Sequence, residues 1–333
     1  MNDTEKKIRW GIMGVAKINQ RLIPGFKGAK KASLQAIASR SLEKAREAAK
    51  VDEIPQAYGS YEELLADKNI DAIYIPLPNH MHYEWACKCA DVGKHVLCEK
   101  PLTPIAKESE SLVDYFEKKK IKLMDGFFWP HHPRTHLMKK IIQEGKIGQV
   151  QQVHGAFTFP LQPLSTENIR LQADSAGGGL LDVGCYPVYG IRWAMQEEPL
   201  SVFAKSTLFA GVDVNLCAQL TFANNRYATF SCGFISPFRA GLEIVGTEGV
   251  LKVDNMWVPK EPTSYWLGDG ENGFTEHRLE PVNQISCMID DISEAILNNS
   301  EVIPHPREAI KTLKVLDAIK ASTIEGREVL VQK

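Results

Sequence analysis

Short apolar runs and longer amphipathic stretches alternate along the first 125 residues of the chain. Apolar runs typical of buried strands begin at residue 8 and lie at residues 33–38, 70–75, 96–98 and 121–124. Patterns of helical period lie between them at residues 42–50, 83–92 and 104–120. Strands that alternate with helices of this length form parallel sheets through crossover connections. We therefore expect a doubly wound α/β sheet.

Beyond residue 126 the pattern changes to strand-like segments separated by turn signals. These segments lie at residues 151–159, 201–207, 216–222, 227–231, 241–246 and 250–254. Their succession indicates a large, open, mostly antiparallel sheet with one face covered, and its other face is a candidate for self-association. We expect two domains, residues 1–125 and 126–333, with an amphipathic last helix at residues 306–325 that could pack back on the first domain.

The first expected strand ends in a degraded dinucleotide fingerprint. Gly14, Ala16 and Asn19 occupy the three glycine places of Gly-x-Gly-x-x-Gly. These places serve a tight turn, close approach of the backbone to a pyrophosphate, and close packing of the helix. Alanine suits the second place, whereas asparagine at the third predicts looser packing. Taken alone, this fingerprint is a weak indication of a nucleotide site.

The second expected strand ends in Ser39 and Arg40, and no acidic residue follows until Glu43. A cofactor with a free ribose 2′-hydroxyl calls for an acidic residue at this strand end. Serine and arginine suit a 2′-phosphate instead, through a charge-assisted contact worth roughly 1.5–3 kcal/mol. The structural alternative is that Ser41 caps the next helix while Arg40 lies exposed. Both can hold, and the pattern favours NADP over NAD.

The apolar run at residues 96–98 leads into Glu99, Lys100 and Pro101. Proline disfavours the helical conformation in the preceding residue and has no backbone donor, so the strand ends there. Ligands bind at the carboxyl ends of strands in open parallel sheets. Lys100 is therefore a candidate phosphate contact or general acid or base, and the alternative is a solvated loop cation.

In the second domain, three glycines at residues 177–179 precede Asp182 and Tyr186. These two residues are four apart and would share one face of a helix. A lysine, a carboxylate and a phenol suffice for carbonyl–alcohol redox chemistry, because one group exchanges the hydroxyl proton while another polarises the oxygen. The structural alternative is a glycine loop followed by an Asp–Tyr pair on a helix surface.

Composition excludes several classes of function. The chain has 39 basic and 41 acidic residues, so no nucleic-acid or anionic membrane partner is indicated. No apolar run has the length of a membrane helix, and the polar first residues lack the core of a signal peptide. Seven scattered cysteines suit free thiols in a reducing cytoplasm. His80 and His82 are two apart and have no nearby Cys or Glu pair, so no metal site is expected.

Taken together, these segments resemble the glucose–fructose oxidoreductase / inositol dehydrogenase (Gfo/Idh/MocA) family. The likeness covers nearly the whole chain and is carried by residues 11–18, 61–65, 70–82, 90–101, 177–186 and 246–249 and by the last helix. The segment at residues 90–101 contains the motif Gly-Lys-His-Val-Leu-Cys-Glu-Lys-Pro. The resemblance implies a Rossmann domain followed by an α/β domain whose open sheet forms the subunit interface of a homodimer or homotetramer.

The resemblance also implies roles for particular residues. Lys100 matches a lysine expected to act at the substrate hydroxyl or carbonyl, and Asp182 matches a nearby acidic residue. Tyr186 stands where many members carry histidine and some sugar ketoreductases carry tyrosine. With Trp129, from the aromatic stretch at residues 127–134, these three are expected to line the substrate pocket. Cofactor contacts are expected at Gly11, Met13, Gly14, Val15, Ala16, Ile18, Ser39, Arg40, Leu77, Asn79, His82, Glu99, Lys100 and Arg170.

These observations predict an NADP-dependent oxidoreductase that exchanges hydride between nicotinamide and a hydroxyl- or carbonyl-bearing carbon of a sugar or polyol-like substrate. The alternatives are a trans-dihydrodiol or D-xylose-type aldose dehydrogenase, and a non-catalytic NADP-binding regulator of the same fold. Lys100, Asp182 and Tyr186 together argue against a regulator, because a sensor has no need of all three. Lys100 and Tyr186 both remain candidate proton donors, and free sugars and sugar nucleotides both remain candidate substrates.

Overall fold

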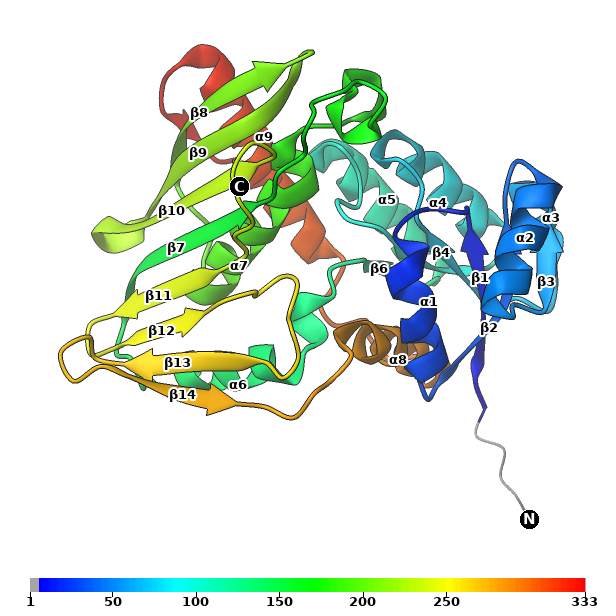
Figure 1. The fold of residues 1–333 in the computed structure, drawn as a ribbon, viewed down its shortest axis with the longest axis horizontal. Coiled ribbons are helices and arrows are strands. Elements are labelled where there is room, and N and C mark those ends of the chain that lie inside the picture. The colour runs from blue at the N-terminus through cyan, green and yellow to red at the C-terminus, as the bar shows by residue number, and fades with distance from the viewer. Residues whose placement is uncertain (1–5, 333) are drawn as a thin grey trace. The chain divides into compact units, whose positions relative to one another are not determined.

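The computed structural model describes residues 6–332, which form two compact units (Figure 1). The first unit comprises the chain up to Thr103, Lys107–His131 and Asn283–Ala309. The second comprises Pro104–Ala106, His132–Val282 and the chain from Ile310 onward. The first unit thus includes a late segment that a single boundary at residue 125 leaves out.

The first unit is built on six parallel strands in the order β3-β2-β1-β4-β5-β6. Their bounds are β1 (Ile8–Met13), β2 (Ala32–Ala38), β3 (Gln56–Tyr58), β4 (Ala72–Ile75), β5 (His95–Cys98) and β6 (Leu123–Asp125). The strand order reverses between β1 and β4, the point at which doubly wound sheets bind their ligands. The predicted doubly wound sheet is confirmed.

Helices α1 (Asn19–Gly28), α2 (Leu42–Asp52), α3 (Tyr61–Ala66), α4 (His82–Asp91), α5 (Ala106–Lys119) and α8 (Gln284–Leu297) accompany this sheet. Short 3₁₀ turns η1 (Asn79–Met81) and η2 (Trp129–His131) follow β4 and β6. Helix α8 shares the core of β1, where the Trp10 indole Nε1 donates a hydrogen bond to Ser293 Oγ over 3.1 Å. This long-range packing explains why residues 283–309 belong to the first unit.

The second unit contains a nine-stranded sheet in the order β14-β13-β12-β11-β7-β10-β9-β8-β15. Its strands are β7 (Val150–Thr158), β8 (Ser201–Phe209), β9 (Val212–Phe222), β10 (Arg226–Gly233), β11 (Leu242–Gly246), β12 (Val250–Val253), β13 (Ser264–Gly268), β14 (Phe274–Arg278) and β15 (Val329–Leu330). All neighbours are antiparallel except β7 and β10. The expected open, mostly antiparallel sheet is confirmed.

One face of this sheet is covered. Residues of β9 alternate between buried and more exposed positions, as a half-covered strand requires. Helix α7 (Cys185–Met195) lies against β7, where a Cβ on Gly155 would meet Pro187 Cβ at 2.8 Å. The unit also contains α6 (Pro133–Gln143) and most of α9 (Arg307–Glu325). From Ile310 onward α9 belongs to this unit, where Arg192 donates to Thr312 Oγ1 over 2.8 Å.

No helix within residues 6–332 combines the length and the apolar character needed to cross a membrane.

Candidate active site

The turn between β1 and α1 is held in place by Asn19. Gly14 has φ +132°, a conformation that other residues rarely adopt, and a Cβ there would lie 3.2 Å from Leu77. The Asn19 side-chain amide donates a hydrogen bond to the Gly14 carbonyl over 2.8 Å and is buried. The looser packing expected at Asn19 is therefore not found. Its side chain is buried and stabilises the turn through a hydrogen bond that a glycine at this position could not make.

The remaining fingerprint residues divide into buried and accessible ones. Gly11 and Met13, expected to contact the cofactor, are buried within β1, and a Cβ on Gly11 would lie 2.8 Å from Leu64. Val15 is exposed, and Ala16 and Ile18 are partly exposed. The accessible part of this segment is thus the turn itself.

The end of β2 shows the helix cap and the exposed arginine expected of it, and the contact of Arg40 with a 2′-phosphate stays a prediction. The Ser41 hydroxyl caps α2 by accepting from Lys44 N, and Ser39 Oγ accepts from Ser41 N over 3.3 Å. Arg40 is exposed. Its charge acts on Tyr61, because burial raises the pKa of the Tyr61 hydroxyl and the positive charge of Arg40 opposes that rise. The Tyr61 hydroxyl lies 3.8 Å from the place of a Cβ on Gly14. Arg40 therefore lies at the same rim of the sheet as the Gly14 turn, namely the edge formed by the carboxyl ends of the strands.

His82, expected at the cofactor, joins two loops of the first unit. It is fully buried, with Nδ1 3.0 Å from Pro101 O and Nε2 2.8 Å from Leu77 O. Burial lowers its pKa, and the backbone contacts oppose that change. His82 therefore positions the segments that follow β4 and β5. Asn79 lies half-buried at the start of η1, and Leu77 is buried beside Gly14.

Lys100 follows β5 and is partly exposed, and its bond to Pro101 is cis. Glu99 is buried, and its Oε1 accepts a hydrogen bond from the Tyr74 hydroxyl over 2.6 Å. Burial raises the pKa of Glu99, whereas the Lys100 charge lowers it. Asp125, at the end of β6, was not singled out by sequence reasoning, although its place at a strand's carboxyl end was a usable signal. Burial and the Glu99 charge raise the pKa of Asp125 to about 8.

In the second unit, Asp182 lies in a π-helical turn, η5 (Leu180–Gly184), directly before α7. Arg170, expected at the cofactor, donates from Nε to Asp182 Oδ2 over 2.7 Å. Single π turns are frequent at functional sites. Tyr186 opens α7 and is 7% exposed, and its ring meets the Phe157 ring edge-on at 5.1 Å. Asp182 and Tyr186, which were expected on one face of a helix, therefore lie in a π-helical turn and in the first turn of an α-helix.

Two of the three glycines before Asp182, Gly178 and Gly179, pack against a residue that sequence reasoning missed. The Asp213 carboxylate on β9 accepts from Leu180 N over 2.7 Å, and a Cβ on Gly178 would lie 2.4 Å from its Oδ1. Gly178 has φ +111°, a conformation that favours glycine. The glycines thus admit a carboxylate of the chain itself. Asp213 is 31 residues from Asp182, and no local pattern connects them.

Trp129, expected at the substrate, is fully buried in η2. Phe127 and Phe128 are also buried, so this aromatic stretch is largely core. Within the described part of the chain, no group of three or more His, Cys, Asp or Glu side chains is arranged to hold a metal ion.

Two family models match the chain. Residues 8–127 match a model described as "Oxidoreductase family, NAD-binding Rossmann fold". Residues 135–252 match the GFO/IDH/MocA C-terminal domain.

Characterised proteins of three kinds are similar to the chain. A D-xylose 1-dehydrogenase (NADP(+)) from Haloferax volcanii is 33% identical over 96% of this chain and 98% of the relative. A trans-1,2-dihydrobenzene-1,2-diol dehydrogenase from Xenopus laevis is 31% identical over 83% of each. The crystal structure of a 3-ketoreductase from Actinomadura kijaniata, in complex with NADP and TDP-benzene, superposes with a TM-score of 0.88 at 27% identity, covering 95% of this chain and 98% of that one.

Proposed function

Because the chain belongs to the Gfo/Idh/MocA oxidoreductase family, we propose that it is an NADP-dependent enzyme acting on a sugar. In this reaction a hydride passes between nicotinamide and a carbon that bears a hydroxyl or carbonyl. The observation that carries the proposal is the placement of Lys100 directly after β5, at the sheet edge that also carries the Gly14 turn.

The residues of the first unit fit the phosphates of NADP. The Gly14 turn leads into α1, whose amino end offers backbone donors to a pyrophosphate. Arg40, with Ser39, offers a charged contact to a 2′-phosphate on the same rim. When bound, the nicotinamide supplies or accepts the hydride, and side chains of the protein donate or accept the proton.

Lys100 and Tyr186 are the two residues to which we assign the transfer of the hydroxyl proton of the substrate. Each exchanges a proton readily, and a positioned acid or base contributes roughly 10²–10⁴ in rate. Asp182 supports this chemistry from the turn before Tyr186, where Arg170 fixes its carboxylate.

A screen of sugars, polyols and ketosugars with NADPH and NADP in parallel tests the assignment. Turnover with one or more carbohydrates is expected. Tight NADP binding without turnover across the panel would instead identify a non-catalytic regulator. Turnover only with free pentoses or a trans-dihydrodiol favours the second candidate, which the xylose and dihydrodiol relatives support.

The same screen, extended to NADH, tests the contact between Arg40 and a 2′-phosphate. Arg40→Ala is expected to weaken NADPH binding roughly ten- to a hundredfold and to leave NADH binding nearly unchanged. Equal use of NADPH and NADH by the unmodified protein would contradict the 2′-phosphate contact.

We also propose that the chain forms a homodimer or homotetramer through the uncovered face of its nine-stranded sheet, and that it works in the cytoplasm. The exposed aromatic side chains Phe203 and Tyr227 on that sheet support the first proposal. The seven free cysteines suit the reducing compartment of the second.

A further inference from the structure

The turn that carries Asp182 is held to the sheet of the second unit by a carboxylate to which the proposed function assigns no role. Asp213, near the start of β9, accepts a hydrogen bond from Leu180 N through Oδ2 over 2.7 Å. Burial raises the pKa of the Asp213 carboxyl, and hydrogen bonds from the backbone amides of Leu180, Asp213 itself and Gly179 oppose that rise. The carboxylate therefore receives two successive amides at the amino end of η5, an arrangement that stabilises a negative charge.

Three irregularities of the backbone meet at this carboxylate. The first is a close approach, because a Cβ on Gly178 would lie 2.4 Å from Asp213 Oδ1 and a Cβ on Gly179 would lie 3.0 Å from Oδ2. The second is a shift of register beside Asp213 on β9, where Val214 has no partner on β8. The third is the π-helical turn η5. Bulges and π turns are frequent beside functional sites, so their meeting at one carboxylate indicates a functional role.

Hydrogen bonds connect this carboxylate to Asp182. Gly178 N donates to Arg170 O over 2.8 Å, and Asp182 N donates to Gly178 O over 3.1 Å. The side chain of Arg170 closes the group, because its Nε donates to Asp182 Oδ2 over 2.7 Å. Arg170, Gly178 and Asp182 are thus joined by three hydrogen bonds, and the Asp213 carboxylate lies directly against Gly178, the residue that joins the other two.

We propose that Asp213 is a positioning residue for Asp182. Its carboxylate holds the amino end of η5, the turn that carries Asp182 and continues directly into α7, where Tyr186 lies. Asp213 itself exchanges no proton with the substrate and acts only through this turn. The inference rests on the proposed function, in which Asp182 supports the proton transfer.

A double-mutant cycle tests the proposal, because a positioning residue loses its effect once the group that it positions is removed. Asp213→Ala is expected to lower kcat about a hundredfold, since a small displacement of a reacting group has an effect of this size. In the Asp182→Asn background, the same substitution is expected to lower kcat by no more than about twofold. A purely structural role would lower kcat equally in both backgrounds, and that result would overturn the proposal.

Two further variants complete this experiment. Asp213→Asn keeps an oxygen that can accept from Leu180 N, so its kcat is expected to lie between those of Asp213→Ala and the unmodified protein. The matched control is Asp269→Ala, in the loop between β13 and β14. The Asp269 carboxylate also accepts from two backbone amides, those of Glu271 over 3.0 Å and Asn272 over 2.8 Å. This control is expected to keep kcat, because it removes hydrogen bonds of the same kind away from η5.

A second measurement needs no substrate. In hydrogen–deuterium exchange, the peptide that covers residues 178–186 is expected to exchange roughly ten- to a hundredfold faster in Asp213→Ala, because Leu180 N loses a charged acceptor. The rest of the second unit should exchange as in the unmodified protein. Unchanged exchange in this peptide, or faster exchange throughout the second unit, would overturn the proposal. Lack of turnover by the unmodified protein would contradict only the proposed function.

Discussion

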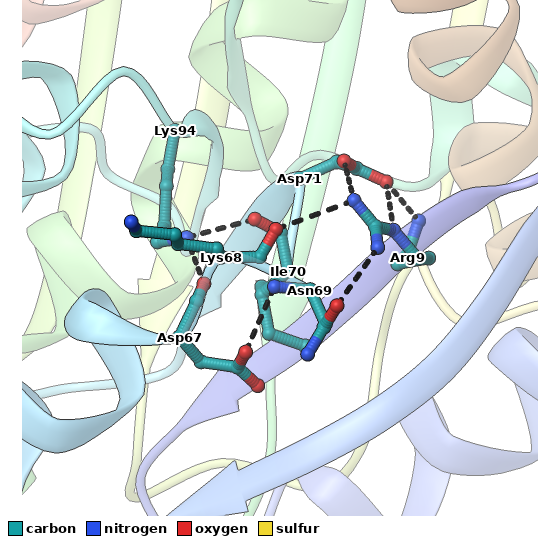
Figure 2. A network of polar contacts seen from close by, with 7 residues as sticks. All are labelled: Arg9, Asp67, Lys68, Asn69, Ile70, Asp71 and Lys94. Carbon is teal, nitrogen blue, oxygen red and sulfur yellow. Dashed lines mark hydrogen bonds and ion pairs between the residues drawn. The ribbon is translucent and has the colours of Figure 1, made fainter.

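Two lysines of one short motif, six residues apart, have different surroundings. Lys94 is 5% exposed, and its ammonium donates to the carbonyls of Asp67 and Ile70 over 2.6 and 2.7 Å (Figure 2). Burial lowers its pKa. Lys100, after the strand, is partly exposed beside two carboxyls. The first lysine holds a loop, and the second lies at the sheet edge where we propose that the reaction takes place.

Lys100→Ala is expected to lower kcat by roughly 10²–10⁴ while NADPH still binds, because a positioned acid or base is lost. Steady-state kinetics and a fluorescence titration with NADPH measure the two effects. The matched control is Lys94→Met, expected to lower the unfolding free energy by about 1–3 kcal/mol as two carbonyls lose their donor, with kcat kept below the unfolding transition. Near-full activity of Lys100→Ala would remove the assignment.

Asn19 gives a second test at this scale. Asn19→Ala removes the hydrogen bond to the Gly14 carbonyl and is expected to weaken NADPH binding by about tenfold, through loss of roughly 1–1.5 kcal/mol. Asn69→Ala, in a loop at the opposite edge of the sheet, is the control. Unchanged affinity of Asn19→Ala in a calorimetric titration would show that the turn holds its shape without this bond.

The residues themselves were only partly predictable. Gly14, Arg40 and Lys100 could be placed at the sheet edge because each directly follows or joins a strand. The burial of His82 and Trp129 could not be foreseen, because both lie in polar or aromatic stretches that also suit a ligand site. The pairing of Arg170 with Asp182 depends on the path of a loop, which local sequence does not specify.

At the scale of elements, the amino ends of the strands carry a polar network of their own. Asp71, just before β4, accepts from Arg9 N and Nε over 2.9 Å each, and its other oxygen accepts from Arg9 Nη2 over 2.7 Å (Figure 2). Burial alone would raise the pKa of Asp71, but these hydrogen bonds outweigh it and lower the pKa. The network ties β1 to the loop before β4.

Because the folded pKa of Asp71 lies below its unfolded value, its stabilisation is complete above that unfolded value, about 3.9, and is lost as the pH falls through the lower folded value. Asp71→Asn should therefore destabilise the protein at pH 5–7, and the difference should shrink towards about pH 3. Urea denaturation across this range measures it, with the exposed Asp174→Asn as control. A difference that is constant with pH would contradict an ionic role for Asp71.

The elements could be predicted more fully than their partners. Periodicity located the strands of the first sheet, because buried strands and amphipathic helices differ in period. It did not show that α8 completes the core of β1, since that contact joins residues nearly 300 positions apart, Trp10 and Ser293. It also did not show the π turn at Asp182, because four-residue spacing reads as ordinary helix.

At the scale of the whole molecule, the uncovered face of the nine-stranded sheet bears on self-association. Phe203 on β8 pairs with Gln219, and Tyr227 on β10 pairs with Thr221. Gln219 and Thr221 are two apart on β9, so all four side chains lie on one face. Phe203 is 42% and Tyr227 40% exposed. Exposed aromatic side chains gathered on one sheet face are typical of an interface between subunits.

Phe203→Glu combined with Tyr227→Glu is expected to reduce the assembly to a smaller species, because buried charges without partners oppose association. Light scattering coupled to size-exclusion chromatography gives the mass at equal protein concentration. Val51→Glu, at an exposed apolar position on α2, is the control and should keep the native mass. An unmodified protein that runs as a monomer, or a double variant that keeps the native mass, would place the interface elsewhere or remove it. If the smaller species retains NADPH binding, cofactor binding does not depend on assembly, as the position of the Gly14 turn and Arg40 in the first unit predicts.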